Sequence, residues 1–457
     1  MAVARSETKF TEVNTNGKGY GTLSRQQMYA FVYDCYWGSR GFVTGDYLFE
    51  FTREGGYAER KKQAFYRNYI KGVLNSVINP VFSEEATRIY KSDILEAFLK
   101  NVDRKGTGIQ KFVKTAVRYE KLQGVTFIVM DNVQEPPITE SEAIASRQFP
   151  YIYYMTGEMV YQYYMPDTTL EWISFKDGEH KTKDGKVQLR YRMWTTTESY
   201  YFIINDGVKE KVSDVSIHNL GKVPVIITYA DDTNEFLPLP PYYDICKLNL
   251  AVYNQDSEQR SLERTGAFPL LAIQDDAPET AVDIGKDSIL WYGTDNSNAP
   301  EFIEPKKDTF ELLINSADKN IRSLVEQANS LGATVISSTA GKSGDAYEME
   351  FLGQNFELMT TKMQAEDIED SIVALWDRYM NTTTEYVVDY KENYKPTISD
   401  VERKLKLLSD ALFLDLGDSV TAAIKVDIVN MLGILNSWED EQMVAMRESI
   451  NIVSSVV

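Results

Sequence analysis

The chain has 457 residues and a formal net charge of −20 at neutral pH, from 68 acidic and 48 basic side chains. A protein that grips nucleic acid through its phosphates needs a surplus of cations, so this balance argues against tight binding to DNA or RNA. An acidic wall facing DNA would instead repel it and let it slide. The apolar share of 43% is normal for a folded protein, and the length suffices for two or three packed modules.

The few cysteines and histidines narrow the chemistry further. Cys35 and Cys246 give no disulfide framework and suit a protein of the cytosol. His180 and His218 lack a partner at metal-ligand spacing, so we expect no zinc site. The polar N-terminus lacks a signal core and the longest apolar run, Val125–Met130, is too short to cross a bilayer. We therefore expect a soluble protein that stays inside the producing cell and has no membrane contact.

Residues 1–123 are predicted to be mainly helical. Apolar residues recur at spacings of three and four in Lys61–Leu74, which indicates one helical face. Asp93–Leu99 and Phe112–Leu122 show the same spacing, and the glycine-bearing segment Asp103–Gly108 is predicted to be the turn between them.

From Gly124 the pattern changes to that of strands. The predicted strands are Val125–Met130, Tyr151–Met155, Met159–Tyr164, Leu170–Phe175, Val187–Trp194, Tyr200–Ile204 and Val223–Tyr229. Asp177-Gly178, Asp184-Gly185 and Asp206-Gly207 are predicted to form tight turns between strands, because such pairs adopt positive φ. The 29 tyrosines fit either solvated strands or surfaces that pack against partners. Residues 124–230 are thus predicted to be an antiparallel β-rich module.

Two helices flanking a small β insertion are predicted next. Tyr242–Arg264 follows a proline-rich segment and carries a thin apolar stripe among charged residues, which suits packing on one or two neighbours. The insertion contains the predicted strands Phe268–Ile273 and Ser288–Tyr292. The second helix is predicted to run from a capping Asp308 to Leu331, before Gly332. The stripe of the first helix comprises Ile245, Leu248, Val252 and Tyr253.

The segment Ala333–Gly344 is small and polar with one charge, Lys342, and precedes a long helix over Asp345–Met380. The predicted buried face of that helix comprises Ala346, Met349, Leu352, Phe356, Met359, Met363, Ile368, Ile372, Leu375, Trp376 and Tyr379. Short helices are predicted after residue 396, one of them with a capping box of Ser399 and Glu402.

Two patterns that suggest enzymes are weak. Gly341-Lys342-Ser343 ends like a phosphate-binding loop, but Ile336 stands where that motif requires glycine. Carboxylates hold magnesium in nucleases, and acidic residues cluster at 231–232, 275–276 and 366–370. We expect the acids at 231–232 and 275–276 to lie in loops and those at 366–370 on the outer side of a helix. In both places acidic side chains are ordinarily solvated. We expect no catalytic residue, metal or cofactor, and a divalent-metal-dependent enzyme acting on nucleic acid is the alternative.

The order of helix, small β insertion, helix, flexible loop and long helix resembles the portal proteins of tailed bacteriophages. The resemblance is strongest to a portal family long known only as a domain of unknown function. The matching stretches are Phe65–Phe82, Leu122–Asp131, Leu248–Pro269 and Gln327–Ala333.

The resemblance implies an α+β, portal-type fold and a division of the chain into named parts. These are a wing over 1–241 (helical 1–123, β-rich 124–230), stem helices 242–264 and 308–332, a clip 265–307, a tunnel loop 333–344, a long wing helix 345–395 and a crown-like helical region 396–457.

A portal subunit assembles into a ring, usually of twelve copies, at one vertex of the capsid. It conducts double-stranded DNA during packaging and ejection, docks the terminase large subunit and then the head–tail adaptor, and contacts the major capsid protein and scaffold. The resemblance therefore implies a protein of the virion, present in the host cytoplasm during assembly, with no enzymatic activity. Another structural protein of the virion, such as an adaptor, is a third interpretation, although adaptors are usually shorter.

The resemblance also implies two groups of functional residues. The tunnel-loop group faces DNA and comprises Lys342, Ser337, Ser338, Thr339 and Ser343. Lys342 is either a transient phosphate contact or a solvated loop lysine. The clip group docks partners and comprises Trp291, Tyr292, Asp295, Asn296 and Asn298.

Overall fold

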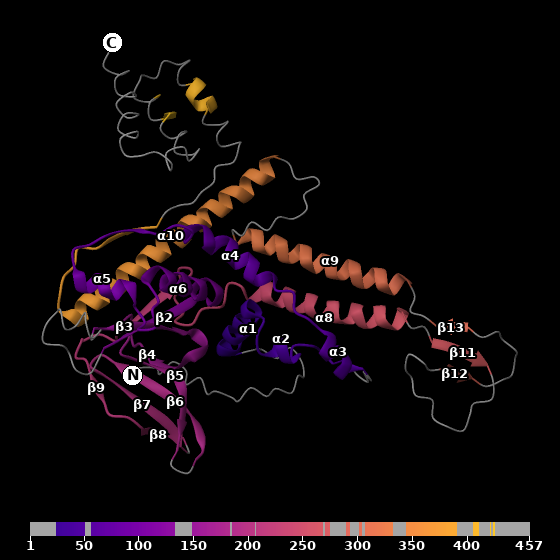
Figure 1. Ribbon diagram of the computed structural model, residues 1–457, viewed down its shortest axis with the longest axis horizontal. Helices are drawn as coiled ribbons and strands as arrows, with labels where there is room; N and C mark the ends of the chain where they lie inside the picture. The colour runs from indigo at the N-terminus through magenta and orange to yellow at the C-terminus, as the bar shows by residue number, and fades with distance from the viewer. Residues whose placement is uncertain are drawn as a thin grey trace. The chain divides into compact units, whose positions relative to one another are not determined.

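The computed structural model describes most of the chain between residues 24 and 390. The described residues are 24–50, 56–132, 149–182, 185–205, 207–267, 270–274, 289–292, 301–303, 307–331, 344–390, 405–410, 421, 424 and 425. The chain divides into one unit over Met1–Glu392 and a second over Asn393–Val457. The predicted mixed α+β class is confirmed, because helices and predominantly antiparallel sheets alternate along the first unit (Figure 1).

Helices make up the N-terminal part, as predicted. They are α1 (Arg25–Trp37), α2 (Gly41–Thr44), α3 (Tyr57–Gln63), α4 (Tyr69–Val81), α5 (Asp93–Lys100) and α6 (Ile109–Gln123). Ser24 caps α1 in a capping box with Gln27, and Gly38 ends it in the left-handed conformation. The predicted turn between α5 and α6 is confirmed.

The prediction of one continuous helix over Lys61–Leu74 is wrong, because the chain breaks between α3 and α4. Ala64 is extended, and the Asn68 side chain accepts the Lys71 N–H to cap α4. The backbone of the break is also held from outside, since Asn249 on a distant helix accepts from the Tyr69 N–H and donates to the Arg67 carbonyl. The spacing of apolar residues cannot reveal that a distant side chain will bond to these backbone groups in place of the helix.

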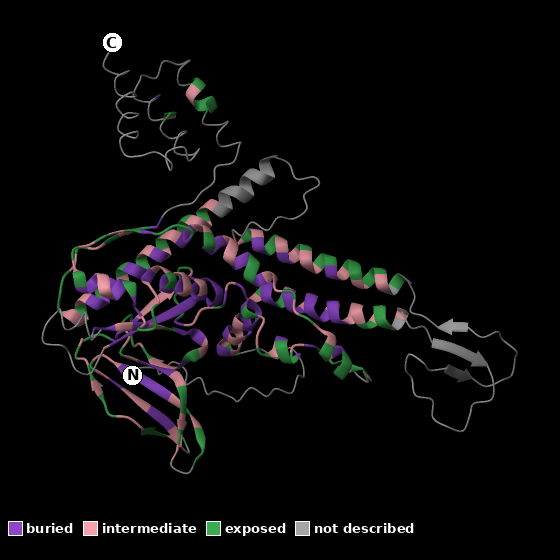
Figure 2. Ribbon diagram, in the orientation of Figure 1, coloured by how far each residue is buried: buried purple, intermediate pink, exposed green. Residues whose placement is uncertain are grey.

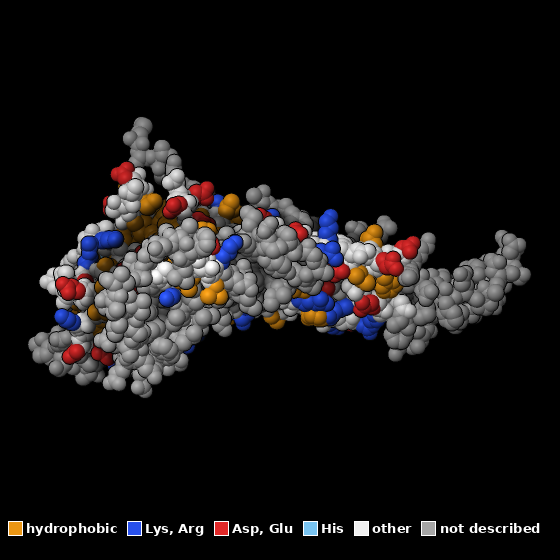
Figure 3. All heavy atoms as spheres, turned by 90° about the horizontal axis from the view of Figure 1, so that it is seen from above, with side chains coloured by type: hydrophobic (Ala, Val, Ile, Leu, Met, Phe, Trp, Pro, Cys, Tyr) orange, Lys and Arg blue, Asp and Glu red, His pale blue; other side chains and the backbone are white. Residues whose placement is uncertain are grey.

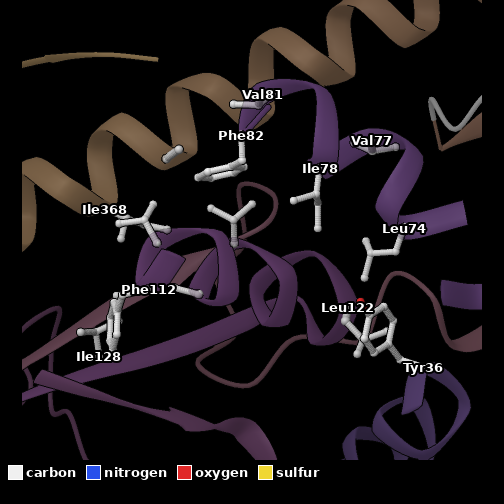
Figure 4. Packing of buried hydrophobic residues seen from close by; sticks show 14 of the residues in the cluster. Tyr36, Leu74, Val77, Ile78, Val81, Phe82, Phe112, Leu122, Ile128 and Ile368 are labelled. Atoms are coloured by element: carbon white, nitrogen blue, oxygen red, sulfur yellow. The ribbon is translucent and has the colours of Figure 1, made fainter. Parts of the chain in front are cut away.

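The main core lies where α4, α6 and the long helix α10 (Gly344–Met380) meet the strand β2 (Val125–Asp131). Figure 4 shows Ile78 and Val81 of α4 opposite Ile368 of α10, with Phe112 of α6 and Ile128 of the sheet beneath them. All five side chains are buried. These contacts between elements far apart in the sequence fix α10 against the N-terminal helices.

Two sheets form the β-rich module that the sequence predicts. Their strands are β2 (Val125–Asp131), β3 (Tyr151–Thr156), β4 (Val160–Tyr164), β5 (Trp172–Lys181), β6 (Val187–Thr195), β7 (Glu198–Asn205), β8 (Val208–Lys211), β9 (Ser216–Ile217) and β10 (Val225–Tyr229). The inner sheet has the order β10-β2-β3, and the outer sheet the order β4-β5-β6-β7-β8 with β9 beside β7. A second core joins the sheets, with Phe127 of β2 in edge contact with Phe175 of β5. A single 3-10 turn (Gly157–Met159) links β3 to β4.

One of the three predicted turns is wrong. Asp177-Gly178 lies inside β5, where the pairing with β6 shifts between Lys176 and Glu179 and Gly178 takes a φ of 80°. An inserted residue of this kind forms a β-bulge, which needs the same positive φ as a turn. Gly185 and Gly207 have positive φ and lie where β5 turns into β6 and β7 into β8, as predicted.

The predicted helices around the small insertion are confirmed with shifted ends. They are α8 (Tyr243–Ala267) and α9 (Lys307–Ser330), and β11 (Leu270–Gln274), β12 (Ile289–Tyr292) and β13 (Glu301–Ile303) lie between them in the chain. β12 is parallel to β11 and β13 antiparallel to it; β13 was not predicted. Asp308 lies in the first turn of α9 and is therefore not its cap.

Two short elements and the C-terminal region complete the description. β1 (Thr87–Ile89) pairs with β14 (Val387–Asp389), which follows α10. Residues 405–410 are helical. The predicted capping box of Ser399 and Glu402 lies outside the described residues.

Candidate functional site: a two-helix stem anchored by polar side chains

The helices α8 and α9 lie side by side and antiparallel (Figure 1). Gln255 donates to the Ser316 hydroxyl at 2.8 Å and accepts from the Asn320 amide at 2.9 Å. Near the far end, the Phe310 ring lies against Gly266, where a Cβ would come within 3.1 Å of the ring. The pair is called the stem below, and its 25-residue helix α8 is about 37 Å long.

Only one end of the stem is buried in the helical body. Among the residues whose burial is described, the last buried one of α8 is Ser257 and the first buried one of α9 is Ala317. Beyond these positions the described residues of both helices are half-buried or exposed, as Figure 2 shows along α8 and α9. The described residues at the end of the stem next to β11–β13 therefore add nothing to the buried core.

Asn249 is the centre of the contact that holds the stem. It is fully buried, accepts from the Tyr66 hydroxyl at 2.9 Å and from the Tyr69 N–H at 3.2 Å, and donates to the Arg67 carbonyl at 2.9 Å. The Tyr66 hydroxyl also contacts the Cys35 carbonyl, and the Tyr69 N–H also donates to the Arg67 carbonyl, whereas the buried amide of Asn249 has its needs met by these three groups. Asn249 thus joins α8 to the break between α3 and α4.

One turn further along α8, a second set of polar contacts repeats this pattern. Asn254 accepts from the Phe49 N–H at 2.9 Å and donates to the Tyr47 carbonyl at 3.1 Å. Arg60 donates to the Ser257 hydroxyl at 2.9 Å and to the Phe49 carbonyl. We call Asn249, Asn254 and Ser257 the polar joint of α8.

An ion pair borders the polar joint. Asp256 is buried, and its Oδ2 lies 2.9 Å from Arg67 Nε without hydrogen-bond alignment. Burial raises the pKa of Asp256, and the charges of Arg67 and Arg260 oppose that rise. Arg260 in turn lies over the Phe65 ring at 3.5 Å.

The sequence prediction of α8 missed the polar joint. Of the predicted stripe, Ile245, Val252 and Tyr253 are buried and Leu248 is half-buried. The stripe is only part of the buried surface of α8, because the polar joint is buried as well. Asp256 belongs to the buried side, although its charge favoured the solvated face. Asparagine is unfavourable inside helices because its amide competes for backbone groups, and that was the one available signal at Asn249 and Asn254.

Replacing Asn249 by alanine tests the polar joint. The change removes three hydrogen bonds at a fully buried position, each typically worth about 1 kcal/mol, so we expect the free energy of unfolding to fall by about 3 kcal/mol. Urea unfolding followed by circular dichroism measures this. Gln259→Ala, in the half-buried part of the same helix, is the control and should change stability by less than about 0.5 kcal/mol. Equal effects of the two changes would contradict the assignment.

The acidic residues of α10 do not all face solvent, which corrects the sequence interpretation. Glu369 is fully buried and its two oxygens contact Nε and Nη2 of Arg88 at 2.5 and 3.1 Å. The Tyr390 hydroxyl donates to Oε2 of Glu369 at 2.6 Å, and the Tyr386 hydroxyl donates to Oε1. The carboxylate is saturated by protein donors, so it serves to join β1, α10 and the segment around β14. Asp367 and Asp370 are exposed, as predicted.

Glu369→Ala is expected to lower the free energy of unfolding by roughly 3–5 kcal/mol, because it leaves the Arg88 guanidinium buried and unpaired. Thermal or urea unfolding measures the loss. Asp367→Ala, on the exposed side of the same helix, should cost less than about 0.5 kcal/mol. A double replacement, Arg88→Met with Glu369→Leu, should recover most of the loss. Failure of that recovery would show that the cost is not one of an unpaired charge.

Another buried carboxyl group, that of Glu120 on α6, is protonated at neutral pH. It is 1% exposed, and its Oε2 makes no hydrogen bond with the described part of the chain. Burial raises the pKa of Glu120 to about 8, and the charges of Asp367 and Asp231 act in the same direction, while Thr228 and Lys121 act against it. The neighbouring Lys121 is buried too and pairs with Glu357 at 2.6 Å.

This pKa predicts a pH dependence of stability. The folded chain keeps a proton on Glu120 that the unfolded chain releases above its ordinary pKa of 4.5. The free energy of unfolding therefore falls as the pH rises from about 4.5 to about 8, by up to roughly 5 kcal/mol. Glu120→Gln removes this contribution, so the variant should gain stability over wild type at pH 8.5 and little at pH 5. Unfolding at both pH values, with the exposed Glu171→Gln as control, measures it; an unchanged pH profile in Glu120→Gln would contradict the assignment.

The sequence-predicted site residues are only partly described. The tunnel-loop group, Lys342, Ser337, Ser338, Thr339 and Ser343, lies outside the described residues, as do Asp295, Asn296 and Asn298 of the clip group. Trp291 and Tyr292 lie on β12, where they pair with Ile273 and Gln274 of β11. Asp231 and Asp232 are exposed, in a loop as predicted, and Asp275 and Asp276 lie outside the described residues.

The described part of the chain also lacks the features of a metal site and of a membrane-spanning helix. Within it, no three His, Cys, Asp or Glu side chains come together as a metal site would require. None of its helices combines the length and apolar character needed to cross a membrane. Cys35 and Cys246 are free and buried, with the Cys35 sulfur 4.0 Å from the Cys246 carbonyl oxygen. On the face seen in Figure 3, cationic and acidic side chains are interspersed.

No protein-family model matches the chain, and no curated protein matches its sequence.

Proposed function

We propose that this chain is the portal subunit of a tailed bacteriophage, a ring-forming protein that conducts double-stranded DNA and has no enzymatic activity. The observation that carries the proposal is the stem. An antiparallel helix pair, buried at one end, carries a small β module at the other and is followed by a long helix over the body. This is the arrangement expected of stem, clip and wing helix in a portal.

An exposed apolar stripe on α10 supports assembly with further copies. Phe356, Met359 and Met363 follow one another at spacings of three and four and are 70%, 52% and 55% exposed. They lie on the side of α10 opposite its buried residues Ala365, Ile368 and Ile372, which corrects their predicted place in the core. Apolar residues gathered in this way mark protein contacts. In a closed ring every subunit offers such a surface to its neighbour.

The charge and the stem fit DNA passage rather than DNA capture. A net charge of −20 per subunit is multiplied in a ring, and an acidic channel repels the phosphates that slide through it. The polar joint would hold the stem at a fixed angle to each body, so that the channel keeps its width. The tunnel-loop group around Lys342 would then face the DNA, and Trp291 and Tyr292 would belong to the surface that docks the terminase and later the adaptor.

Electron microscopy of the purified chain tests the proposal. We expect rings with an axial hole wide enough for duplex DNA, about 20 Å, seen in end-on views that also give the subunit number. Replacing Met359 and Met363 by glutamate should abolish rings and leave the melting temperature of the released subunit nearly unchanged, because the two side chains are exposed. Lys111→Glu, on the exposed side of α6, is the control and should form rings. A monodisperse monomer or dimer at assembly concentrations, with metal-dependent cleavage of DNA, would overturn the proposal.

A further inference from the structure

β10 is an edge strand of the inner sheet, and one of its two edges has no partner among the described strands. In the order β10-β2-β3, β2 pairs on both sides, whereas β10 pairs only with β2 among the described strands. An unpaired edge presents a row of backbone donors and acceptors that another strand can join.

Two hydrogen bonds show which backbone groups of β10 face outward. The Met130 N–H donates to the Pro224 carbonyl at 3.0 Å, and the Ala230 N–H donates to the Gly124 carbonyl at 3.1 Å. Since bonded and non-bonded pairs alternate in an antiparallel ladder, the even-numbered residues between them bond to β2. The N–H and C=O of Ile227 therefore point to the open edge. Neither group has a hydrogen-bond partner in the described part of the chain.

A groove runs along this edge. A cavity of about 550 Å³ is bounded by β10, by the loop after β4 and by the last turns of α10. Three consecutive β10 residues, 225–227, line it. Successive side chains of a strand point to opposite faces, so a cavity that meets all three lies beside the strand edge and not over one face. Met165 and Leu170 form one apolar wall, and Ala374 and Leu375 the other.

Two cations stand in the same groove. Lys222 precedes β10 and Arg378 lies on the last turn of α10; both line the cavity and both are exposed. Neither makes an ion pair with an acidic side chain of the described ranges. In a chain with 20 more acidic than basic side chains, two such cations beside one apolar groove indicate a ligand that brings its own carboxylates.

We propose that the β10 groove binds an extended segment of a partner polypeptide, in which aliphatic residues alternate with acidic ones. The segment adds to the sheet as a strand beside β10, bonding to the backbone of Ile227. Its aliphatic side chains pack against the groove walls and its carboxylates pair with Lys222 and Arg378. Strand addition of this kind takes affinity from backbone bonds and specificity from side-chain contacts. The inference rests on the groove alone and holds whether or not the chain forms a ring.

The test uses the full chain and a labelled library of eight-residue peptides in which valine or isoleucine alternates with glutamate or aspartate. Binding is measured by fluorescence anisotropy. We expect saturable binding that weakens about tenfold or more when the acids are replaced by their amides. Methylation of alternate backbone nitrogens on the bonding edge should abolish it, because it removes the strand donors. No binding by any member, or equal binding of the amide and acid forms, would overturn the proposal.

Variants of the chain locate the binding. Ile227→Pro removes the outward N–H without touching the bonds to β2, and should abolish binding. Lys222→Glu with Arg378→Glu should weaken it about tenfold or more, and this variant keeps the test valid if the proline change unfolds the sheet. Lys186→Glu, an exposed cation outside the groove, is the control. If the charge reversal leaves affinity unchanged, the groove is not the site. If instead sedimentation shows the chain binding itself in a manner lost in these variants, the occupant is a second copy and the partner proposal is overturned.

Discussion

The contact on which the rest of the first unit depends is that of Asn249 with the break between α3 and α4. A buried asparagine in the middle of a helix is costly unless its amide is satisfied, and here both ends of the amide bond to Tyr66, Arg67 and Tyr69. The same bonds supply partners to a stretch of backbone that has left the helical conformation. The buried asparagine therefore depends on the break for its partners. Through this contact α8 takes a fixed place on the body, and α9 then follows α8 as its antiparallel partner.

Buried charges play a related part elsewhere in the unit. Arg88 with Glu369, Arg192 with Asp131 and Lys121 with Glu357 each join segments that are far apart in the sequence. Such pairs give little net stability, since the loss of hydration offsets the attraction, but an unpaired member is strongly destabilising. They therefore penalise incorrect packing of α10 and of the sheets more than they stabilise the correct one. Glu120 shows the opposite solution, because a carboxyl group buried without a saturating partner remains protonated at neutral pH.

The described part of the chain presents two surfaces for which we propose partners, and they differ in chemistry. The stripe of Phe356, Met359 and Met363 is apolar and lies on the outer side of a helix, which suits packing against another preformed surface. The β10 groove offers backbone groups and two cations, which suits an extended acidic segment. Both lie on or beside α10. The long helix that fixes the core thus also positions the surfaces for which we propose partners, one for further copies of the chain and one for a different polypeptide.

The sequence by itself determined the type and order of most elements. Apolar spacing located α5, α6, α8, α9, α10 and the strands of the β-rich module except β8 and β9, because local periodicity records which side of an element is buried. It could not distinguish a turn from a bulge at Gly178, since both need positive φ, and it could not place Phe356 or Met363 outside the core, since an apolar residue looks the same against a core or a partner. Only the tertiary structure decided that Asn249, Asp256 and Glu369 are buried. Their partners Tyr66, Arg67 and Arg88 lie some 180–280 residues away, and polar residues are buried only where other groups of the folded chain satisfy them.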